Sequence, residues 1–498
     1  MAPLTDTPNE IIYHICGFVP KISDLKNPCL TSKSLRSSAE PFLYSSVILE
    51  YSFLCIPRIV PLLRTLLRRP ELFQHLDTVS MNGWGFGGQD DSRAIDLKSL
   101  DTAFKEQCLA AIEKTNVPFT ELWIKKFNSG ETCLEALSAL LLANLSSGTK
   151  RLALMRNFIN GRELIGKVMQ AKAYGELPAL DRLKEIKYFK GYDYQITTRN
   201  DTFEDVISLF YLPAVTDIVA WVPNSPDFRW PAGAPNLDHL TSLDIARLSD
   251  QHMGKILSLT RNLKSLLWTW EYDDSEDPWL PPTLDFDKIV AILSKVRHTL
   301  DTLLFRLNIK GGHHSYLYQP IFFPNLTILG SFRGLAGFDR LTDLEVPLIS
   351  LAGFGDSPQP LEESIPTNIK TLALSKDMLL DRAVKWQEGF GAHVFDIMKD
   401  LIQLLAKNVP TRLPHLHRLV LLEDAEGTKY GCIFKKYEAC ATAESWADGY
   451  EMLSLPRELP LARYSFGWRT IPDMQYVRTD CPLWARDLKD TIRRARRI

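Results

Sequence analysis

The sequence predicts an α/β protein in which a short three-helix unit precedes a long, irregular array of alternating strands and helices. Three observations carry this prediction. The first 48 residues contain three short amphipathic patterns, a six-residue apolar pattern returns from residue 76 to residue 421, and some intervals between its copies have helical spacing. Short strands that alternate with helices are typical of a parallel sheet with helices on its outer face. Each unit buries its apolar side only against its neighbours, so stacking forms the core.

Length and composition limit the class of protein. The 498 residues are enough for roughly two to four ordinary domains or for one extended array. With 45% hydrophobic and 24% charged residues, the chain has the composition of a protein with a large core rather than a disordered one. The 58 basic and 60 acidic residues leave a net charge of −2, which gives no overall attraction to nucleic acid or to an anionic membrane. We therefore expect neither as a partner.

The cysteines and the first residues predict an intracellular protein. None of the eight cysteines forms a CxxC pair, and the opening MAPLTDTPNE lacks the basic start and apolar core of a secretory signal. No uncharged apolar run approaches the ~20 residues that a membrane helix needs. Reduced thiols in the cytoplasm, the nucleus or both are the expected state.

The first helix has a clear start in the sequence. We expect Thr7 to cap it, Pro8 to occupy its first position and Glu10 to complete a capping box. An apolar stripe follows at four-residue spacing, and it consists of Ile11, Ile15 and Val19, with Ile12 beside them.

Two shorter helices are expected after the first. One can begin at Ser23 and Asp24, and the other runs from about Ser32 to Ala39, before Pro41 redirects the chain. Three helices within ~45 residues cannot bury this much apolar surface among themselves. They must pack on the rest of the chain, on a partner, or on both.

A resemblance to a known family rests on many positions of this helical unit. The matching residues are Leu4, Pro8, Glu10, Ile11, Ile15, Leu25, Leu30, Ser32, Lys33, Leu35, Arg36, Ala39, Pro41, Leu43 and Tyr44. Their pattern resembles an F-box, particularly the version common in fungal proteins. The resemblance implies that the three helices dock onto the Skp-family adaptor of an SCF (cullin–RING) ubiquitin ligase, and through the adaptor onto a cullin.

The resemblance also implies which residues touch the adaptor. In the family, the leading Leu-Pro pair and apolar residues of helices one and three make the contact, which here gives Leu4, Pro8, Ile11, Ile12, Ile15, Leu35 and Leu43. One departure is Pro28, which stands where the family usually has Leu. A proline inside a helix removes one backbone hydrogen bond, here to the Asp24 carbonyl, and can cost ~3 kcal/mol, so we expect a kinked or shortened second helix. The alternative is that the three helices are only an N-terminal cap of the array.

The array is predicted from one short pattern: apolar, two others, apolar, one other, apolar. Clear copies begin at residues 76, 119, 183, 240, 263, 300, 323, 341, 369 and 416, and weaker copies centre on Leu152 and Ile218. Several steps fall in the ~20–29 residue range of a leucine-rich repeat. The step between the copies centred on residues 326 and 344 is too short, so one of those two is suspect. Helical spacing in the intervals is clearest at Leu100, Phe104, Cys108 and Ile112, and at Ile289, Leu293 and Val296.

The two halves together resemble F-box proteins with degenerate leucine-rich repeats. The predicted domains are an F-box at residues 1–48, an irregular leucine-rich-repeat solenoid at 49–424, and a segment at 425–498 that caps the open end of the array. That last segment is expected to begin with an insertion and a helix. An ordinary α/β enzyme fold is the alternative for the array.

The resemblance implies a substrate receptor, in which the F-box attaches to the ligase and the repeats hold the client protein to be ubiquitinated. Residues between the apolar positions of a repeat are expected to face outward along the concave side of the sheet. The candidate client contacts are Trp123, Lys125, Lys187, Trp221, Asp244 and Arg306, because aromatic residues and arginine dominate interfaces. The alternative is that an insertion buries Trp123 or Trp221.

No pattern in the sequence points strongly to catalysis. The GWGFGG run at 83–88 fits GxGxxG, yet two aspartates follow where phosphate would lie, which favours a flexible loop. His313-His314, His415 with His417, and Cys432 with Cys440 lack further ligands at metal spacing. The acidic run at 271–277 is typical of a solvated loop, although it could receive a basic segment of a client. The arginines at 493–497 fit a helix end better than a nuclear import signal.

We therefore expect no enzymatic activity, no cofactor and no metal. Two rival interpretations stay open. One is a protein-interaction scaffold whose F-box-like helices recruit no ligase, and the other is an enzyme with an unrecognised site.

Overall fold

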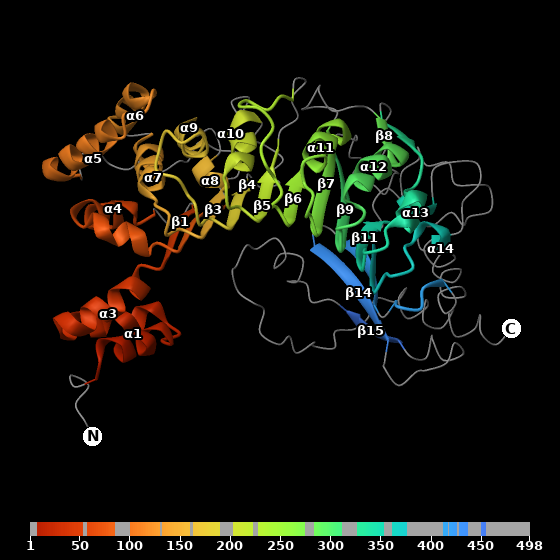
Figure 1. Ribbon diagram of the computed structural model, residues 1–498, viewed down its shortest axis with the longest axis horizontal. Coiled ribbons are helices and arrows are strands. Elements are labelled where there is room, and N and C mark those ends of the chain that lie inside the picture. The colour runs from red at the N-terminus through yellow and green to blue at the C-terminus, as the bar shows by residue number, and fades with distance from the viewer. Residues whose placement is uncertain are drawn as a thin grey trace. The chain divides into compact units, whose positions relative to one another are not determined.

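Figure 1 shows the computed structural model of the chain. The chain divides into two compact units, Met1–Leu240 and Thr241–Ile498, which are described separately. The structure describes residues 7–52, 57–84, 100–129, 132–159, 163–189, 203–222, 228–273, 283–310, 326–352, 361–375, 412–416, 418–425, 428–436 and 450–454. The division falls inside the predicted array, and the domain limits at residues 48 and 424 stay predictions.

The described part of the first unit contains five parallel strands that pair in chain order. They are β1 (Ser46–Ser52), β2 (Thr78–Trp84), β3 (Arg151–Met155), β4 (Glu185–Phe189) and β5 (Asp217–Trp221). The central apolar residues of four predicted copies pair in register across these strands, Val79 with Leu152, Leu152 with Ile186, and Ile186 with Ile218. All four are buried. The first strand, β1, was not predicted.

The second unit repeats this arrangement. Its parallel strands are β6 (Ser242–Ala246), β7 (Ser265–Asp273), β9 (Thr302–Lys310), β11 (Asp343–Pro347), β12 (Thr371–Ser375) and β13 (Arg418–Ala425). Each strand carries a predicted copy of the pattern, and its central leucine pairs with the central leucine of the next strand. These residues are Leu243, Leu266, Leu303, Leu344, Leu372 and Leu419.

A shared backbone acceptor marks the start of successive strands. The carbonyl of Asp77 accepts from the amides of Lys150 and Arg151, and the carbonyl of Lys150 accepts from those of Lys184 and Glu185. Six more carbonyls accept two hydrogen bonds from consecutive amides in the same way, and they are those of Ser45, Lys184, Thr241, Lys264, Asp301 and Thr342. One junction geometry therefore recurs along both units.

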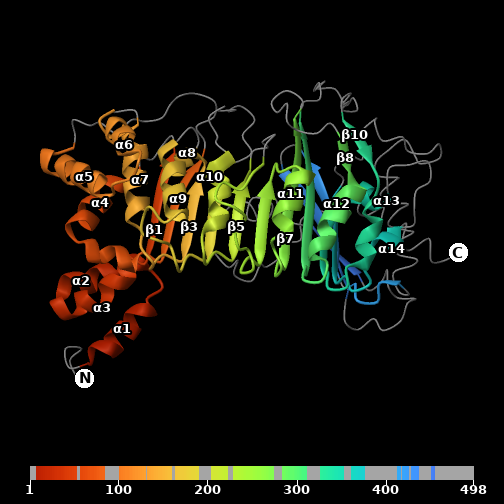
Figure 2. The ribbon, with the colours of Figure 1, turned by 45° about the horizontal axis from the view of Figure 1, so that its top comes forward.

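Helices occupy most described intervals between strands. The first unit contains α4 (Ile59–Arg68), η3 (Pro70–His75), α5 (Thr102–Lys114), α6 (Thr120–Phe127), α7 (Cys133–Asn144), α8 (Arg156–Ile159), α9 (Glu163–Ala173), α10 (Phe203–Ile207) and η5 (Ser208–Tyr211). The second contains α11 (Asp250–Leu257), α12 (Phe286–Leu293), η6 (Ser294–Val296), η7 (Phe332–Gly337), α13 (Leu348–Ala352) and α14 (Leu361–Ser364). Figures 1 and 2 show α8–α10 along one side of β3–β5, and α11–α13 along one side of the second unit's strands. The predicted α/β class is confirmed.

The apolar spacing in the intervals marks real helices. Phe104, Cys108 and Ile112 are the buried residues of α5, and Ile289 and Leu293 are buried in α12. The predicted helices at these two places are confirmed, because a four-residue apolar spacing needs a helical backbone to reach one core.

One predicted copy of the pattern is a helix rather than a strand. Residues 119–124 lie mostly in α6, where Trp123 and Phe127 are buried four residues apart. The indole Nε1 of Trp123 donates to the carbonyl of Ala136 in α7 at 3.0 Å. An acid in the first turn, Glu121, and two lysines in the last turn suit the helix dipole. The prediction that Trp123 and Lys125 lie on a repeat strand is therefore wrong.

The copy that begins at residue 323 is also outside the main ladder. Its strand, β10 (Thr327–Leu329), pairs with β8 (Thr283–Asp285) in a separate two-stranded sheet. The short step that made this copy suspect has its physical reason here, because too few residues separate it from β11 for another crossover.

Two strands are described after residue 425, where an insertion and a helix were expected, and residues 426–427 and 437–449 lie outside the described residues. β14 (Thr428–Lys436) and β15 (Tyr450–Ser454) pair antiparallel, β14 with β13 and β15 with β14. Residues 455–498 of the predicted capping segment lie outside the described residues.

Candidate docking surface

Three helices precede the first strand and enclose a small core. They are α1 (Asn9–Gly17), α2 (Lys26–Thr31) and α3 (Lys33–Leu43), with the single 3₁₀ turn η2 (Ile22–Leu25) before α2. The buried core residues are Ile12, Cys16, Leu25 and Ala39, and Val19, Cys29, Leu35, Phe42 and Leu43 pack against them.

The first helix begins one residue later than predicted. Pro8 precedes α1, and its carbonyl accepts from the amides of Ile11 and Ile12 at 3.0 and 3.1 Å. No side chain caps α1, so the capping box expected from Thr7 and Glu10 does not form. The hydroxyl of Ser34 instead donates to Asn9 Oδ1 at 2.8 Å and ties α3 to the first turn of α1.

Apolar residues occupy two sides of α1. Ile12 and Cys16, four residues apart, face the core. Ile11 and Ile15 are 50% and 51% exposed, and Phe18, just after the helix, is 86% exposed. Residues at i, i+4 and i+7 lie on one helix face, so Ile11, Ile15 and Phe18 form a continuous outward row, which we call the α1 stripe.

The exposed apolar side chains of the described residues are concentrated in these helices. Six of the nine large ones lie between residues 11 and 30, and they are Ile11, Tyr13, Ile15, Phe18, Ile22 and Leu30. Single exposed apolar residues are ordinary on protein surfaces, whereas clusters mark interaction sites. The sequence spacing 11–15–18 could have revealed Phe18, but the prediction selected Val19 instead.

Pro28 lies where a proline is tolerated. The second helix is divided into η2 and α2, and Pro28 is the third residue of α2. The amides of a helix's first turn have no partner within the helix, so a proline there forfeits no helical hydrogen bond. The shortened helix is confirmed, and the ~3 kcal/mol expected for an interior proline does not apply.

The third helix passes through its proline. α3 continues beyond Ala39 through Pro41 to Leu43, contrary to the predicted end. Its start is fixed by the hydroxyl of Ser32, which accepts from the amide of Leu35 at 3.1 Å. Phe42 and Leu43 pack on the core of the helical unit, and this packing outweighs the bond that Pro41 removes near the helix end.

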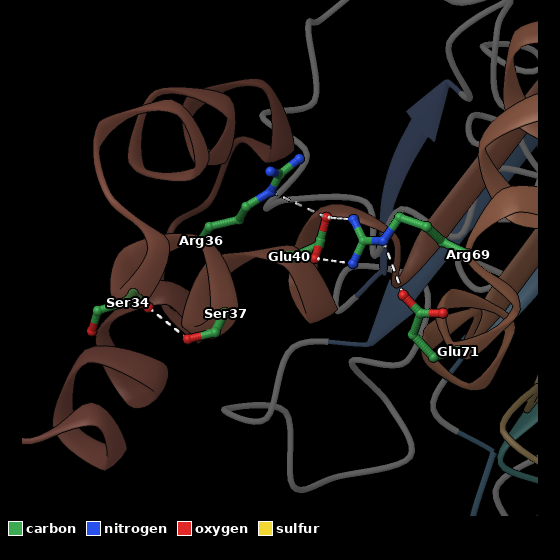
Figure 3. Close-up of polar contacts among 6 residues, drawn as sticks. All are labelled: Ser34, Arg36, Ser37, Glu40, Arg69 and Glu71. Carbon is green, nitrogen blue, oxygen red and sulfur yellow. Dashed lines mark hydrogen bonds and ion pairs between the residues drawn. The ribbon is translucent and has the colours of Figure 1, made fainter.

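A polar joint ties α3 to the turn that follows α4 (Figure 3). Arg69 donates to both carboxylate oxygens of Glu40, at 2.5 and 2.7 Å, and its Nε donates to Glu71 at 2.9 Å. Arg36 lies 3.6 Å from Glu40 on the other side. The hydrogen bonds from Arg69 hold the pKa of Glu40 below its usual value, so the carboxylate stays charged.

The structure separates the predicted adaptor contacts into three groups. Pro8, Ile11 and Ile15 are exposed, and Leu35 and Leu43 are half-buried against the core. Ile12 is 4% exposed and belongs to the core, so its assignment as an adaptor contact is wrong. Leu4 lies outside the described residues.

Arg306 is buried rather than exposed, so its predicted role as an outward client contact is wrong. Its Nε donates to Glu345 at 2.5 Å, and the two side chains are 10% and 5% exposed. Thr269, its neighbour on β7, is buried, and so is Glu271 on the same strand. The acidic run therefore begins inside β7 rather than in a solvated loop, and residues 274–277 lie outside the described residues. Partners far apart in sequence make this pair, so local pattern could not predict it.

Four of the other five predicted client contacts are at least partly exposed, and Trp123 is not. Lys187 on β4 and Trp221 on β5 are half-buried on the outward side of their strands, in alternation with buried residues. Asp244 is half-buried on β6. Lys125 is exposed on α6 and not on the sheet, whereas Trp123 is core.

The glycine-rich run begins as part of a strand. Gly83 lies in β2, and a Cβ atom there would lie 2.4 Å from the Cβ of Asn157. Asn157 of α8 donates from Nδ2 to the carbonyl of Tyr51 at 2.8 Å. Gly83 thus permits α8 to approach the sheet, and its predicted place in a flexible loop is wrong. Residues 85–88 lie outside the described residues.

The described part of the chain contains no group of three or more His, Cys, Asp or Glu side chains placed to hold a metal ion. His313, His314, His417, Cys440, the Cys432 side chain and residues 493–497 lie outside it. Of the helices that are described, none is long and apolar enough to cross a membrane.

No family model matches the chain, and no curated protein matches it. What the helical unit and the sheets do is therefore argued from their own geometry and from the sequence pattern.

Proposed function

We propose that this protein is the substrate-recognition subunit of an SCF-type (cullin–RING) ubiquitin ligase. The observation that carries the proposal is the α1 stripe, an exposed apolar row on a helical unit whose own core holds four buried apolar residues. A surface of this kind gains free energy when a partner covers it, by ~1.5–3 kcal/mol for a large side chain that starts fully exposed and by about half of that for Ile11 and Ile15, which are half exposed.

On this proposal the three N-terminal helices are an F-box, and the α1 stripe docks onto a Skp-family adaptor that is bound in turn to a cullin. Two features support the assignment. The stripe is built from Ile11 and Ile15, which match the family pattern, and the adjoining Phe18 enlarges it. The early position of Pro28 in α2 removes the main objection that the sequence raised.

The strand-and-helix part is proposed to be an irregular leucine-rich-repeat solenoid that holds the client protein. The ladder of central leucines in the second unit supports this, because equivalent residues of the pattern pair with one another. The backbone carbonyl that accepts two hydrogen bonds at the start of successive strands supports the repeat assignment as well. Such arrays present long surfaces to partners.

The receptor itself catalyses nothing on this account. It holds a lysine of the client near the ubiquitin-loaded enzyme and thereby raises the effective concentration of the two reacting groups. The proposed place of action is the cytoplasm, the nucleus or both.

The test is the double substitution Ile11→Asp with Ile15→Asp in the full-length chain. Two carboxylates in the α1 stripe place charge in the proposed apolar contact, and we expect co-purification of the adaptor to be lost. Both side chains point away from the helical core, so α1 and the sheets should stay folded, as circular dichroism and a thermal melt would show.

A matched control is Ile48→Asp, since Ile48 of β1 is 59% exposed and lies outside the three helices. This variant should bind the adaptor as the wild type does. Retention of the adaptor by the Ile11 and Ile15 double variant would show that the stripe is not the docking site.

A scaffold without a ligase role is the second candidate, and the Glu40–Arg69 joint is the observation that favours it. The joint links the helical unit to the rest of the first unit, which is expected if the three helices are an N-terminal cap of the array. Wild-type protein that captures no adaptor would favour the scaffold.

A further inference from the structure

An exposed group of aromatic rings lies in the first unit, outside the surfaces considered so far. Tyr174 follows α9 and is 38% exposed, and Tyr211 and Trp230 are half-buried. The ring centres of Tyr174 and Tyr211 are 5.4 Å apart, and those of Tyr211 and Trp230 are 6.2 Å apart. Both pairs meet edge to face, so the three rings pack together as one group, which we call the aromatic shelf.

Buried neighbours hold the shelf in place. The rings of Phe210 and Phe228, both nearly inaccessible, contact Trp230 at centre distances of 5.9 and 5.0 Å. The hydroxyl of Tyr211 donates to the carbonyl of Gly233 at 2.5 Å and accepts from the amide of Ala232 at 3.3 Å. A rigid aromatic surface binds a partner with little loss of side-chain entropy.

The end of α9 presents Tyr174 to solvent. Gly175 has φ of +79°, a value that favours glycine, and the amide of Glu176 donates to the carbonyl of Ala171 at 2.8 Å. This is the six-to-one hydrogen bond of a Schellman motif, in which the chain turns sharply away from the helix. Leu177 then packs inward while Tyr174 stays outside.

The electrostatic surroundings of the shelf favour a cation. The carboxyl end of α9 carries the negative end of the helix dipole. Glu176 and Glu204 are exposed. The pKa of Tyr174 is raised mainly by burial, then by Tyr211, and Glu204 adds to the shift. Arg229, which precedes Trp230, is an exposed opposing charge. The ammonium of Lys172 is turned into the interior, where three carbonyls bind it.

The protein's own cations leave the shelf uncovered. Arg64 lies over the ring of Phe104 at 5.2 Å, far along the chain from the shelf. Among the described residues, no lysine or arginine makes such a contact with Tyr174, Tyr211 or Trp230. The faces of Tyr174, Tyr211 and Trp230 are therefore not covered by a described lysine or arginine.

We propose that the aromatic shelf binds an arginine side chain in a basic segment of a partner protein. Indole and phenol rings attract a cation over their faces, and the weakly hydrated, planar guanidinium stacks on them better than an ammonium does. Glu204 and the carboxyl end of α9 supply the complementary charge. If the proposed function holds, this partner is the client protein, but the predicted binding of arginine does not depend on the proposed function.

The test measures the affinity of the full-length chain for a fluorescein-labelled peptide of alternating glycine and arginine. A matched peptide carries citrulline, which has the shape of arginine without its charge. We expect the arginine peptide to bind more tightly than the citrulline peptide. Trp230→Leu and Tyr174→Leu, which keep apolar area but remove the π face, should each weaken its binding by about 2- to 30-fold.

The control is Tyr13→Leu, because Tyr13 on α1 is exposed to a similar degree outside the shelf. It should leave peptide affinity unchanged, and so should the Ile11 and Ile15 double substitution, which separates this test from that of adaptor docking. If Trp230→Leu lowers the thermal midpoint, Tyr174→Leu still decides the question, since its side chain is the most exposed of the three. Equal binding of the two peptides, unchanged affinity in Tyr174→Leu, or no binding at millimolar peptide would overturn the proposal.

Discussion

Lys172 is a buried charge whose hydrogen-bond partners are all backbone carbonyls. It lies on α9, and its Nζ donates to the carbonyls of Ala143 and Leu145, at the carboxyl end of α7, and to that of Pro178, at 2.9–3.1 Å. A cation at the end of a helix is stabilised by the helix dipole, and three acceptors match the three protons of an ammonium. The residue thus joins the ends of two neighbouring helices.

Burial of Lys172 makes stability depend on pH in a defined direction. Burial lowers its pKa to about 7, against about 10.4 in an unfolded chain. Between those values the unfolded chain binds more protons than the folded one, so the free energy of unfolding rises with pH. With respect to Lys172, the fold is therefore most stable at high pH, where this residue is neutral. It loses stability as the pH falls from about 10.4 towards about 7, because the unfolded chain takes up the proton first.

The comparison that isolates this effect is wild type against Lys172→Met in urea unfolding at pH 6, 7, 8 and 9. The difference in unfolding free energy, wild type minus variant, should increase with pH by at most about 1.4 kcal/mol per pH unit. A difference that is constant over this range would mean that the three carbonyls offset the effect of burial completely.

Between elements, the Glu40–Arg69 joint should contribute measurable stability. Glu40 is 12% exposed and Arg69 is 36% exposed, so the pair is only partly screened by solvent. Glu40→Ala removes two charge-assisted hydrogen bonds, and we expect a loss of about 1–2 kcal/mol after discounting for exposure. Hydrogen exchange measures this loss directly. In Glu40→Ala the protection of the α3 amides should fall, while the protection of the β3 and β4 amides should be unchanged.

The neighbouring Arg36 provides the matched control for this joint. Its side chain is mostly exposed and lies 3.6 Å from Glu40, so Arg36→Ala should change α3 protection by a few tenths of a kcal/mol. If Arg36→Ala and Glu40→Ala lowered the protection of α3 equally, Arg69 would not be the dominant partner of Glu40.

The N-terminal helices show which element features the sequence could predict. Their existence and approximate ends follow from capping residues and four-residue spacing. Which side of α1 is buried did not follow, because Ile11 and Ile12 are equally apolar, and tertiary contacts with Leu25 and Ala39 make the choice. The placement of Pro28 depended on where η2 ends and α2 begins, a shift of a few residues that no local preference fixes.

Along the whole molecule, the repeat pattern predicted strand positions well and failed where helix and strand spacing coincide. The central leucines of the second unit pair from β6 to β13 because the apolar residues of a strand must reach the same core layer. Residues 119–124 also contain the repeat pattern, but the buried Trp123 and Phe127 are four residues apart, which is the period of a helix. Burial on the outward face was not predictable, since it depends on pairs such as Arg306 with Glu345.

The outward side of the strands should therefore respond unevenly to substitution. Arg306→Ala would leave the Glu345 carboxylate buried without this partner, and we expect a loss of about 3–5 kcal/mol. Trp221→Ala removes a half-buried ring at the end of β5 and should cost much less. The double substitution Arg306→Met with Glu345→Leu removes both charges and should recover most of the lost stability. Urea unfolding of the four proteins gives the measurement. Loss of stability in Trp221→Ala as large as in Arg306→Ala would place Trp221 in the core and remove it, like Trp123, from the candidates for client contact.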